Sequence, residues 1–253
     1  MKPTERFSNR AENYRRHRPG YPKAVIELLQ NECGLKSRAA IADVGSGTGI
    51  FTRLLLEAGF QVAAVEPNEA MRRAAEEELH GFSEFRSVAA SAEDTGLPSS
   101  SCDAITVAQA FHWFDARSAA REFRRLLRPE GWVALIWNHR ETGTSAFASE
   151  YEDLLVSLGE LYVDSGHRSL EVESRLRDEF FPDGALRVAR FENPHAMDWP
   201  AFRGRFLSTS YAPAEDNPRY GEYLVRLERL FHAHAKGGEV CFEQTTNVYY
   251  GRM

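Results

Sequence analysis

The chain has 253 residues, 43% of them hydrophobic, and a formal net charge of −6 at pH 7. This apolar content suffices for one packed α/β domain with an insertion or a small lid, and the acidic balance argues against nucleic acid as the substrate, because nucleic-acid grooves collect lysine and arginine. The 3 cysteines are widely spaced, the N-terminus lacks a signal-like apolar core, and no apolar run reaches about 20 residues, which together predict a reduced, cytoplasmic chain without a metal site or a membrane span.

The first part of the chain alternates strand-like and helix-like segments. Short apolar runs predict buried strands, and apolar residues repeating every three or four positions predict the helices between them. Such alternation is typical of a doubly wound α/β fold with a mostly parallel sheet. Strands are expected at residues 39–44, 61–65, 84–88, 104–108 and 132–137, and helices at 22–32, 50–58, 69–80 and 116–127.

Past residue 140 the pattern changes to helices with fewer strands between them. No stretch rich in proline, glycine or serine marks a domain boundary, so we expect a single domain over residues 1–253. In this part, helices are expected at residues 144–161, 169–180, 199–208 and 220–235, and strands at 185–191 and 239–250.

The segment between the first expected strand and the helix after it is rich in glycine. Asp43 is followed by Gly45, Gly47 and Gly49 at alternate positions. Glycine is required where a turn has dihedral angles that a β-carbon forbids, or where a ligand approaches the backbone closely. The helix that begins after Gly49 adds unpaired amides and the positive end of its dipole. The loop is therefore a candidate cofactor site.

Two classes of cofactor compete for this loop. A dinucleotide loop has the pattern G-x-G-x-x-G, whose third glycine would stand at the position of Ile50. Asp43, just before the loop, suits a cationic amine better than a pyrophosphate. Glu66, at the end of the second strand, fits both classes, because dinucleotide sites also hold ribose with an acid about 20 residues beyond their glycines. The spacing thus disfavours NAD without excluding it.

The glycine loop resembles the first motif of the class I methyltransferases, which use S-adenosylmethionine and release S-adenosylhomocysteine, in its sequence Asp43-Val44-Gly45-Ser46-Gly47-Thr48-Gly49. The resemblance implies that the loop holds the methionine part of the cofactor, with Asp43 near its amino group, and that Glu66 binds the ribose hydroxyls. In similar proteins the N-terminal segment folds over the cofactor. The implied cofactor-binding residues are Asp43, Gly45, Gly47, Gly49, Glu66, Ala92, Glu93, Gln109, Tyr14 and Arg18.

The acidic stretch 89–98 follows the third expected strand. By the resemblance, Ala92 gives a backbone amide to the adenine ring, and Glu93 or Asp94 accepts from its exocyclic amine. Taken alone, such a stretch is more often a solvated loop. Its place after the glycine loop and Glu66 favours the adenine site.

A cluster of aromatic residues follows the fourth expected strand, at the end of the sheet where open α/β proteins bind ligands. Its sequence, Gln109-Ala-Phe-His-Trp-Phe-Asp115, resembles a subgroup of small-molecule methyltransferases that includes the trans-aconitate methyltransferase-like proteins. Phe111 and Phe114 are expected in the core. Trp113 is a candidate substrate contact. Two interpretations of His112 are equally good: a structural residue, or a residue that acts on the substrate as a catalytic base or hydrogen-bond donor. The cluster lacks the Asn/Asp-Pro-Pro-Tyr/Phe motif that is expected of methyltransferases acting on the exocyclic nitrogens of nucleic-acid bases or on glutamine amides. Its absence disfavours those groups as methyl acceptors.

The chemistry of the acceptor decides which groups are needed. Arg140, at the end of the fifth strand, is a candidate clamp for a substrate carboxylate, and an exposed arginine is an equally good interpretation. A carboxylate acceptor is already ionised, so methyl transfer to it needs in-line positioning and exclusion of water. A hydroxyl or amine acceptor needs a base, and His112 is the candidate.

The resemblance also implies the rest of the architecture and the activity. The fold would be a seven-stranded, Rossmann-like sheet with the last two strands at its edge, one of them antiparallel. Its parts would be cap helices at 1–38, a cofactor core at 39–140, a helical lid at 141–237 that includes the strand near 185–191, and a final strand at 238–253. We expect S-adenosylmethionine-dependent methyl transfer to a carboxylate or hydroxyl oxygen of a small molecule. An NAD-dependent oxidoreductase and a cofactor-binding protein without turnover are the alternatives.

Overall fold

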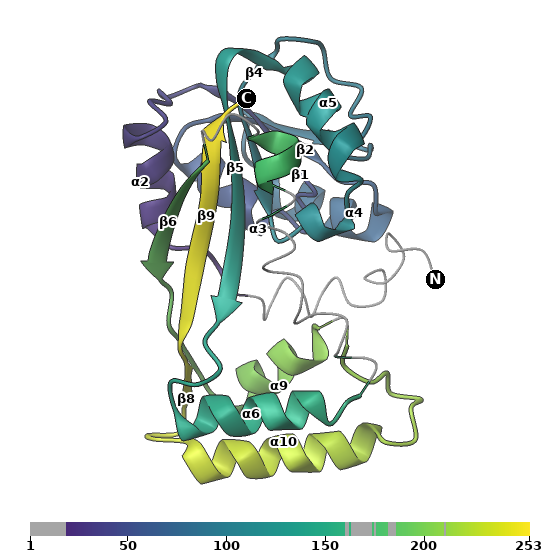
Figure 1. Cartoon of the computed structure of the whole chain (residues 1–253). Helices are drawn as coiled ribbons and strands as arrows, with labels where there is room; N and C mark the ends of the chain where they lie inside the picture. The colour runs from purple at the N-terminus through teal and green to yellow at the C-terminus, as the bar shows by residue number, and fades with distance from the viewer. Residues whose placement is uncertain (1–18, 160–161, 163–173, 175, 182–185, 210) are drawn as a thin grey trace.

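A computed structural model gives the structure of the chain and describes residues 19–159, 162, 174, 176–181, 186–209 and 211–253. The strands of its main sheet are β1 (Ala40–Val44), β2 (Gln61–Val65), β3 (Phe85–Val88), β4 (Cys102–Ala108), β5 (Leu127–Arg140), β6 (Arg187–Glu192) and β9 (Gln244–Arg252). They form a 7-stranded sheet in the order β3-β2-β1-β4-β5-β9-β6 (Figure 1). Neighbouring strands in the part β3-β2-β1-β4-β5 are parallel, and β9 is antiparallel to both β5 and β6. The expected α/β fold class is confirmed.

Helices cover both faces of this sheet. On one face, α2 (Lys23–Asn31), α3 (Ile50–Glu57) and α4 (Glu69–Leu79) pack on alternate strand residues such as Ile41. On the other, α5 (Ala116–Leu126) and the π-helical turn η3 (Leu176–Phe180) pack on the intervening residues, such as Ala42. This alternation is the pattern of a sheet buried on both sides.

Side-chain caps determine where two of these helices begin. Asn68 Oδ1 accepts from the amide of Met71 at 3.0 Å at the start of α4. Asp115 Oδ1 accepts from the amide of Ser118 at 2.8 Å at the start of α5. Each cap satisfies an amide that has no partner inside its helix, so the helices start directly after the strand-end turns that carry the candidate site residues.

Strands β5 and β9 are longer than the rest of the sheet requires. The last residue of β4, Ala108, pairs with Ile136 of β5, but the β5–β9 pairing continues to Arg140 and Gln244. Four further residues of extended chain carry this ribbon roughly 13 Å beyond the end of β4. Figure 1 shows the two strands running from the sheet toward α6 (Ala146–Val156) and α9 (Trp199–Leu207).

A helical layer lies beyond the carboxyl ends of the strands (Figure 1). It consists of α6, α9, α10 (Tyr220–His234) and the two short antiparallel strands β7 (His195–Met197) and β8 (Val240–Phe242). These elements share their own hydrophobic cluster around Tyr151, Phe202 and Phe242. The layer is thus packed internally as well as joined to the sheet.

Two expected strands differ from the structure. The expected strand 239–250 is two strands, β8 and β9, because the chain changes partner from β7 to β5 at Glu243. Strand β5 begins earlier than expected, at Leu127, but residues 128–131 bulge out of it, since Leu127 pairs with Cys102 and Trp132 pairs with Ala104. The expected helix 169–180 falls largely outside the described residues, as do Tyr14 and Arg18.

The described residues show neither a membrane-spanning helix nor a cluster of metal-binding side chains. None of the described helices combines the length and the apolar character that crossing a bilayer needs. Within the same residues, no group of 3 or more His, Cys, Asp or Glu side chains is arranged to hold a metal ion.

Candidate functional site

The glycine loop connects β1 to α3 at the carboxyl edge of the sheet. The amide of Gly45 donates to the carbonyl of Val65 at the end of β2, at 2.8 Å. Gly45, Gly47 and Gly49 have φ angles of 71°, 57° and 82°, in the left-handed region that favours glycine. The backbone of the loop therefore favours glycine at these three positions, as expected.

The three glycines differ in what surrounds them. A β-carbon on Gly45 would lie 2.4 Å from the β-carbon of Ala110, and one on Gly49 would lie 2.8 Å from Leu79 Cδ1. A β-carbon on Gly47 would meet no atom of the described residues within 4 Å. Gly45 and Gly49 thus allow the loop to pack against the protein, whereas Gly47 presents bare backbone to open space, where a ligand can approach it.

Two buried hydroxyl groups in the loop have no hydrogen-bond partner among the described residues. Ser46 Oγ and Thr48 Oγ1 are both inaccessible to solvent, and no described residue bonds to them. Unsatisfied buried hydroxyls are uncommon in folded proteins, because their desolvation is not compensated. Together with the open space at Gly47, they fit a loop that holds a polar ligand.

Glu66 lies directly beside Gly47. Its Oε2 accepts from the amide of Gly47 at 2.9 Å, and its Oε1 accepts from the amide of Asn68 at 2.8 Å. Burial raises the pKa of Glu66, while these two amides and the guanidinium of Arg72 act in the opposite direction. The structure therefore brings together the loop and the acid that the sequence analysis assigned to one site.

Asp43 lies beneath the loop and is fully buried. Its carboxylate accepts from Thr52 Oγ1 of α3 at 2.6 Å and from Thr106 Oγ1 of β4 at 2.9 Å. Burial raises the pKa of Asp43 to about 6, and the two threonine hydroxyls partly offset this rise. The carboxylate thus ties α3 to β4 under the loop, and its expected contact with the cofactor amine stays a prediction.

The acidic turn after β3 is held by a buried carboxylate. Glu122 of α5 accepts from the amide of Thr95 at 3.0 Å, from Thr95 Oγ1 at 2.6 Å and from Arg125 Nη2 at 2.6 Å. The Arg125 guanidinium and the two Thr95 donors hold the pKa of Glu122 at about 2. This brace positions the segment that contains Ala92, which is buried, and Glu93, whose Oε1 accepts from the amide of Asp115 at 3.0 Å.

The aromatic cluster after β4 forms a short 3-10 turn, η2 (Phe111–Trp113). Phe111 is fully buried and its ring packs edge-on against Phe114, as expected for core residues. His112 and Trp113 are half-buried, and their rings lie 4.7 Å apart. They follow the carboxyl end of β4 and lie between Ala110 and Phe114 in the chain, the two residues that pack against Gly45 of the loop.

Gln109 leads into this turn with a strained backbone. Its φ is 58°, which is uncommon for a residue with a β-carbon, and its Nε2 donates to the carbonyl of Asn138 at 3.0 Å. Strain of this kind persists where the surrounding structure compels it, and it concentrates at functional sites. Gln109 therefore links the end of β4 to the end of β5 at the expected site.

Arg140 lies farther along β5, and its side chain is 17% exposed. Its Nη2 bonds to Glu152 of α6 and donates to Tyr162 Oη at 3.0 Å, and the hydroxyl of Tyr162 donates to Glu152 at 2.6 Å. The guanidinium also lies 5.0 Å from the centre of the Tyr151 ring. Arg140 is thus part of the contact between the sheet and the helical layer, separate from the glycine loop.

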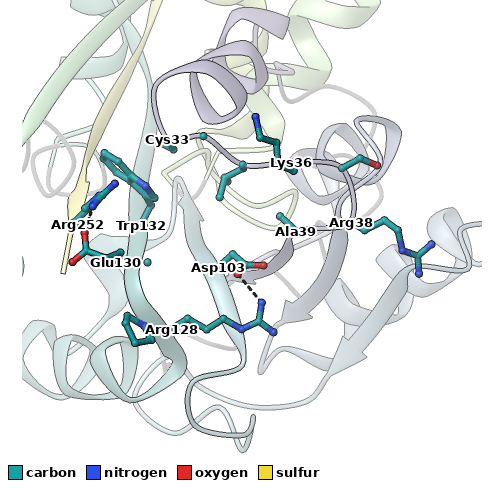
Figure 2. Close-up of a pocket in the computed structure, with 14 residues that line it drawn as sticks. Cys33, Lys36, Arg38, Ala39, Asp103, Arg128, Glu130, Trp132 and Arg252 are labelled. Atoms are coloured by element: carbon teal, nitrogen blue, oxygen red, sulfur yellow. Dashed lines mark hydrogen bonds and ion pairs between the residues drawn. The ribbon is translucent and has the colours of Figure 1, made fainter.

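A cavity lies at the amino ends of β1 and β4, at the end of the sheet opposite the glycine loop (Figure 2). It has a volume of about 410 Å³. Its charged groups bond to one another: Arg128 Nη1 donates to Asp103 Oδ1 at 2.6 Å, and Arg252 pairs with Glu130. Among the described residues, no buried polar atom without a partner lines it. The candidate site is therefore at the carboxyl edge.

Comparisons with known proteins agree with a methyltransferase architecture. Residues 42–135, which run from β1 into β5, match the family model described as a methyltransferase domain. An uncharacterized methyltransferase of Mycobacterium tuberculosis (strain H37Rv) is 36% identical over 135 residues, 53% of each chain. One of Schizosaccharomyces pombe is 30% identical over 136 residues, again 53% of each chain. The matching part thus spans about half the length of these curated relatives.

Solved structures are similar over almost the whole chain. A candidate type II methyltransferase from Anaeromyxobacter dehalogenans is 25% identical, with a TM-score of 0.62, over 93% of this chain and 97% of its own. A phosphoethanolamine N-methyltransferase of Haemonchus contortus, solved with phosphomonomethylethanolamine and S-adenosylhomocysteine, has a TM-score of 0.56 at 16% identity, over 97% of this chain and 57% of its own. The fold is therefore the Rossmann-like methyltransferase fold. None of these comparisons confirms the trans-aconitate subgroup.

Several residues that shape this edge were not identified from the sequence. Thr52 and Thr106 hold Asp43, and Glu122 braces the acidic turn. Each acts through a partner at least 9 positions away in the chain. The polar Thr52 inside an otherwise apolar helix face was the one local signal.

Proposed function

We propose that this protein is an S-adenosylmethionine-dependent methyltransferase that acts on a small molecule. The observation that carries the proposal is the open space above the left-handed Gly47, directly beside the carboxylate of Glu66. The match of residues 42–135 to methyltransferase domains supports it. When bound, the cofactor would supply an electrophilic methyl group on a sulfonium.

The residues at the carboxyl edge suit the parts of this cofactor. Gly47 and the unpartnered hydroxyls of Ser46 and Thr48 would hold its amino-acid part, and Glu66 would accept from its ribose hydroxyls. Ala92 and Glu93 would contact the adenine, because the Glu122 brace keeps their turn beside the start of α5. Tyr14 and Arg18 stay candidates on the sequence alone.

The acceptor would lie between η2 and the helical layer. Gln109 and Trp113 would orient it, and the helical layer would act as a lid that excludes water from the transferring methyl group. We infer a carboxylate or hydroxyl oxygen as the methyl acceptor. A carboxylate would need no proton transfer, whereas a hydroxyl would need His112 as general base.

The proposal also includes the cellular compartment in which the protein acts. Cys33 and Cys102 are buried free thiols, and burial raises the pKa of Cys33 to about 12, which keeps it protonated and unreactive. We propose a reducing, cytoplasmic setting on these grounds.

The test is a methyl-transfer assay with purified protein and S-adenosylmethionine. The acceptor panel contains small mono-, di- and tricarboxylic acids and hydroxy acids, and mass spectrometry measures S-adenosylhomocysteine and the methylated product. We expect acceptor-dependent release of S-adenosylhomocysteine that Gly47→Ala abolishes. Cofactor binding without transfer to any member of a broad panel would favour a binding protein without turnover, and binding of NAD in its place would favour an oxidoreductase.

A further inference from the structure

A row of polar side chains lies where the β5–β9 ribbon meets the helical layer. Arg140 and Gln244 are direct partners in the antiparallel pairing, so their side chains project from the same face, with β-carbons about 5 Å apart. Arg205 of α9 approaches from the helical layer, and its Nη2 donates to Gln244 Oε1 at 2.6 Å. Gln244 thus has one arginine bonded to its amide oxygen and another as its cross-strand neighbour.

Two buried hydrogen-bond donors in this row have no partner in the part of the chain that the structure describes. Arg140 Nε and Gln244 Nε2 are both inaccessible to solvent, and no described residue accepts from them. Gln244 is only 4% exposed, and its oxygen is already used by Arg205. An arginine Nε–H and an amide NH₂ can only donate. The missing partner is therefore a group that accepts hydrogen bonds.

A third unpartnered atom lies on β7, the partner of β8, which leads directly into β9. His195 Nε2 is buried without a partner in the described part of the chain. His195 pairs in register with Phe242, and the Arg205 guanidinium lies 5.0 Å from the centre of the Phe242 ring. Burial and the nearby Arg205 lower the pKa of His195, so its ring is neutral and able to donate one hydrogen bond.

The surrounding rings shield the row from water. Tyr151 is buried beneath Arg140, and Tyr162 packs edge-on against Tyr211 at 5.1 Å. Burial raises the pKa of Tyr151 and of Tyr162, so both phenols keep their protons at neutral pH. Buried donors of this kind favour an oxyanion, because charge-assisted hydrogen bonds strengthen in surroundings of low polarity.

We propose that Arg140, Gln244 and Arg205 form a subsite that binds a carboxylate group of the methyl acceptor. The assignment of the ligand as the acceptor rests on the proposed function, whereas the subsite itself rests on the unpartnered donors. Because Arg140 lies roughly 13 Å along the ribbon beyond the end of β4, the bound carboxylate is remote from the methylated atom. The preferred acceptors are therefore extended acids with a second functional group.

The test is isothermal titration with glutarate, a small dicarboxylate, and with its uncharged diamide as the control ligand. Gln244→Glu is the main variant, because the added carboxylate can pair with both arginines and occupy the subsite without leaving a buried charge unpaired. Gln30→Glu, the same change on the exposed face of α2, is the matched control. We expect glutarate to bind the wild type and Gln30→Glu equally, and Gln244→Glu about 30-fold more weakly or worse.

A second pair of variants addresses the arginine of the helical layer. Arg205→Gln removes a guanidinium from the row, and Arg203→Gln makes the same change at an exposed position of α9. We expect a loss of affinity for glutarate of about tenfold or more in the first and none in the second. Thermal unfolding of each variant shows that the comparison is between folded proteins.

Three results would overturn the subsite: no binding of glutarate to the wild type, equal binding to Gln244→Glu, or equal binding of the diamide. Inorganic phosphate that binds more tightly than glutarate would overturn the assignment to a carboxylate. A separate titration with S-adenosylhomocysteine distinguishes the two proposals. Glutarate binding without S-adenosylhomocysteine binding would contradict the proposed function alone, and the reverse result would contradict the subsite alone.

Discussion

The substitution Gly47→Ala separates the ligand-binding role of the glycine loop from its structural role. Gly47 has a φ of 57°, and a β-carbon there would meet no atom within 4 Å from the residues that the structure describes. The cost to the fold is therefore the left-handed backbone alone, about 1–2 kcal/mol. In a chain of this size that cost lowers the melting temperature by about 2–8 °C. The new methyl group would occupy the space assigned to the cofactor.

We expect Gly47→Ala to weaken binding of S-adenosylhomocysteine by about 100-fold or more, which corresponds to about 2.8 kcal/mol. Gly34→Ala is the matched control, because Gly34 has a φ of 67° and equally open surroundings far from the loop. It should show the same fall in melting temperature with unchanged affinity. Isothermal titration and thermal unfolding of both variants measure these effects. Wild-type affinity in folded Gly47→Ala would refute the assignment of this space to the cofactor.

Three further predictions concern single side chains. Asp43 has a pKa of about 6 in the folded protein against an ordinary value of 3.8, so its stabilising contribution is present below pH 3.8 and is lost as the pH rises through 6. Asp43→Asn should therefore raise the free energy of unfolding at pH 8 by up to about 3 kcal/mol, and a less stable variant in urea unfolding would contradict this. Glu122 has a pKa of about 2 in the folded protein against an ordinary value of 4.5, so its stabilising contribution is present above pH 4.5 and is lost as the pH falls toward 2. Glu122→Gln should lower the free energy of unfolding by up to about 3 kcal/mol at pH 7 and by much less at pH 3, and equal losses of stability at both pH values would rule out an electrostatic cause. For a hydroxyl acceptor, His112→Ala should lower turnover by about 100-fold or more with unchanged affinity for S-adenosylhomocysteine, and full activity on that acceptor would remove His112 from the mechanism.

The sequence was most informative where local pattern and backbone geometry agree. The alternation of strands and helices up to β5 could be read from apolar periodicity, because parallel strands buried on both faces are continuous apolar runs. The glycine loop could be read because Gly45 and Gly49 are the residues that its close packing tolerates. Glu66 could be placed beside the loop because adjacent parallel strands end at the same edge of the sheet.

Features that depend on distant partners could not be read in this way. The break between β8 and β9 follows from a change of pairing partner, which leaves no local signal in the segment 239–250. The brace of Glu122 on Thr95 and the bond of Arg140 to Glu152 join residues that only the tertiary fold brings together. Arg140 could be named as a candidate from its strand end, but its neighbours could not.

The most direct test of the central claim is isothermal titration of the purified protein with S-adenosylhomocysteine, with NAD as the control ligand. The glycine spacing and the open backbone at Gly47 predict binding of S-adenosylhomocysteine in the micromolar range, about −8 kcal/mol, and no measurable binding of NAD. Binding of NAD without binding of S-adenosylhomocysteine would contradict the assignment of the site.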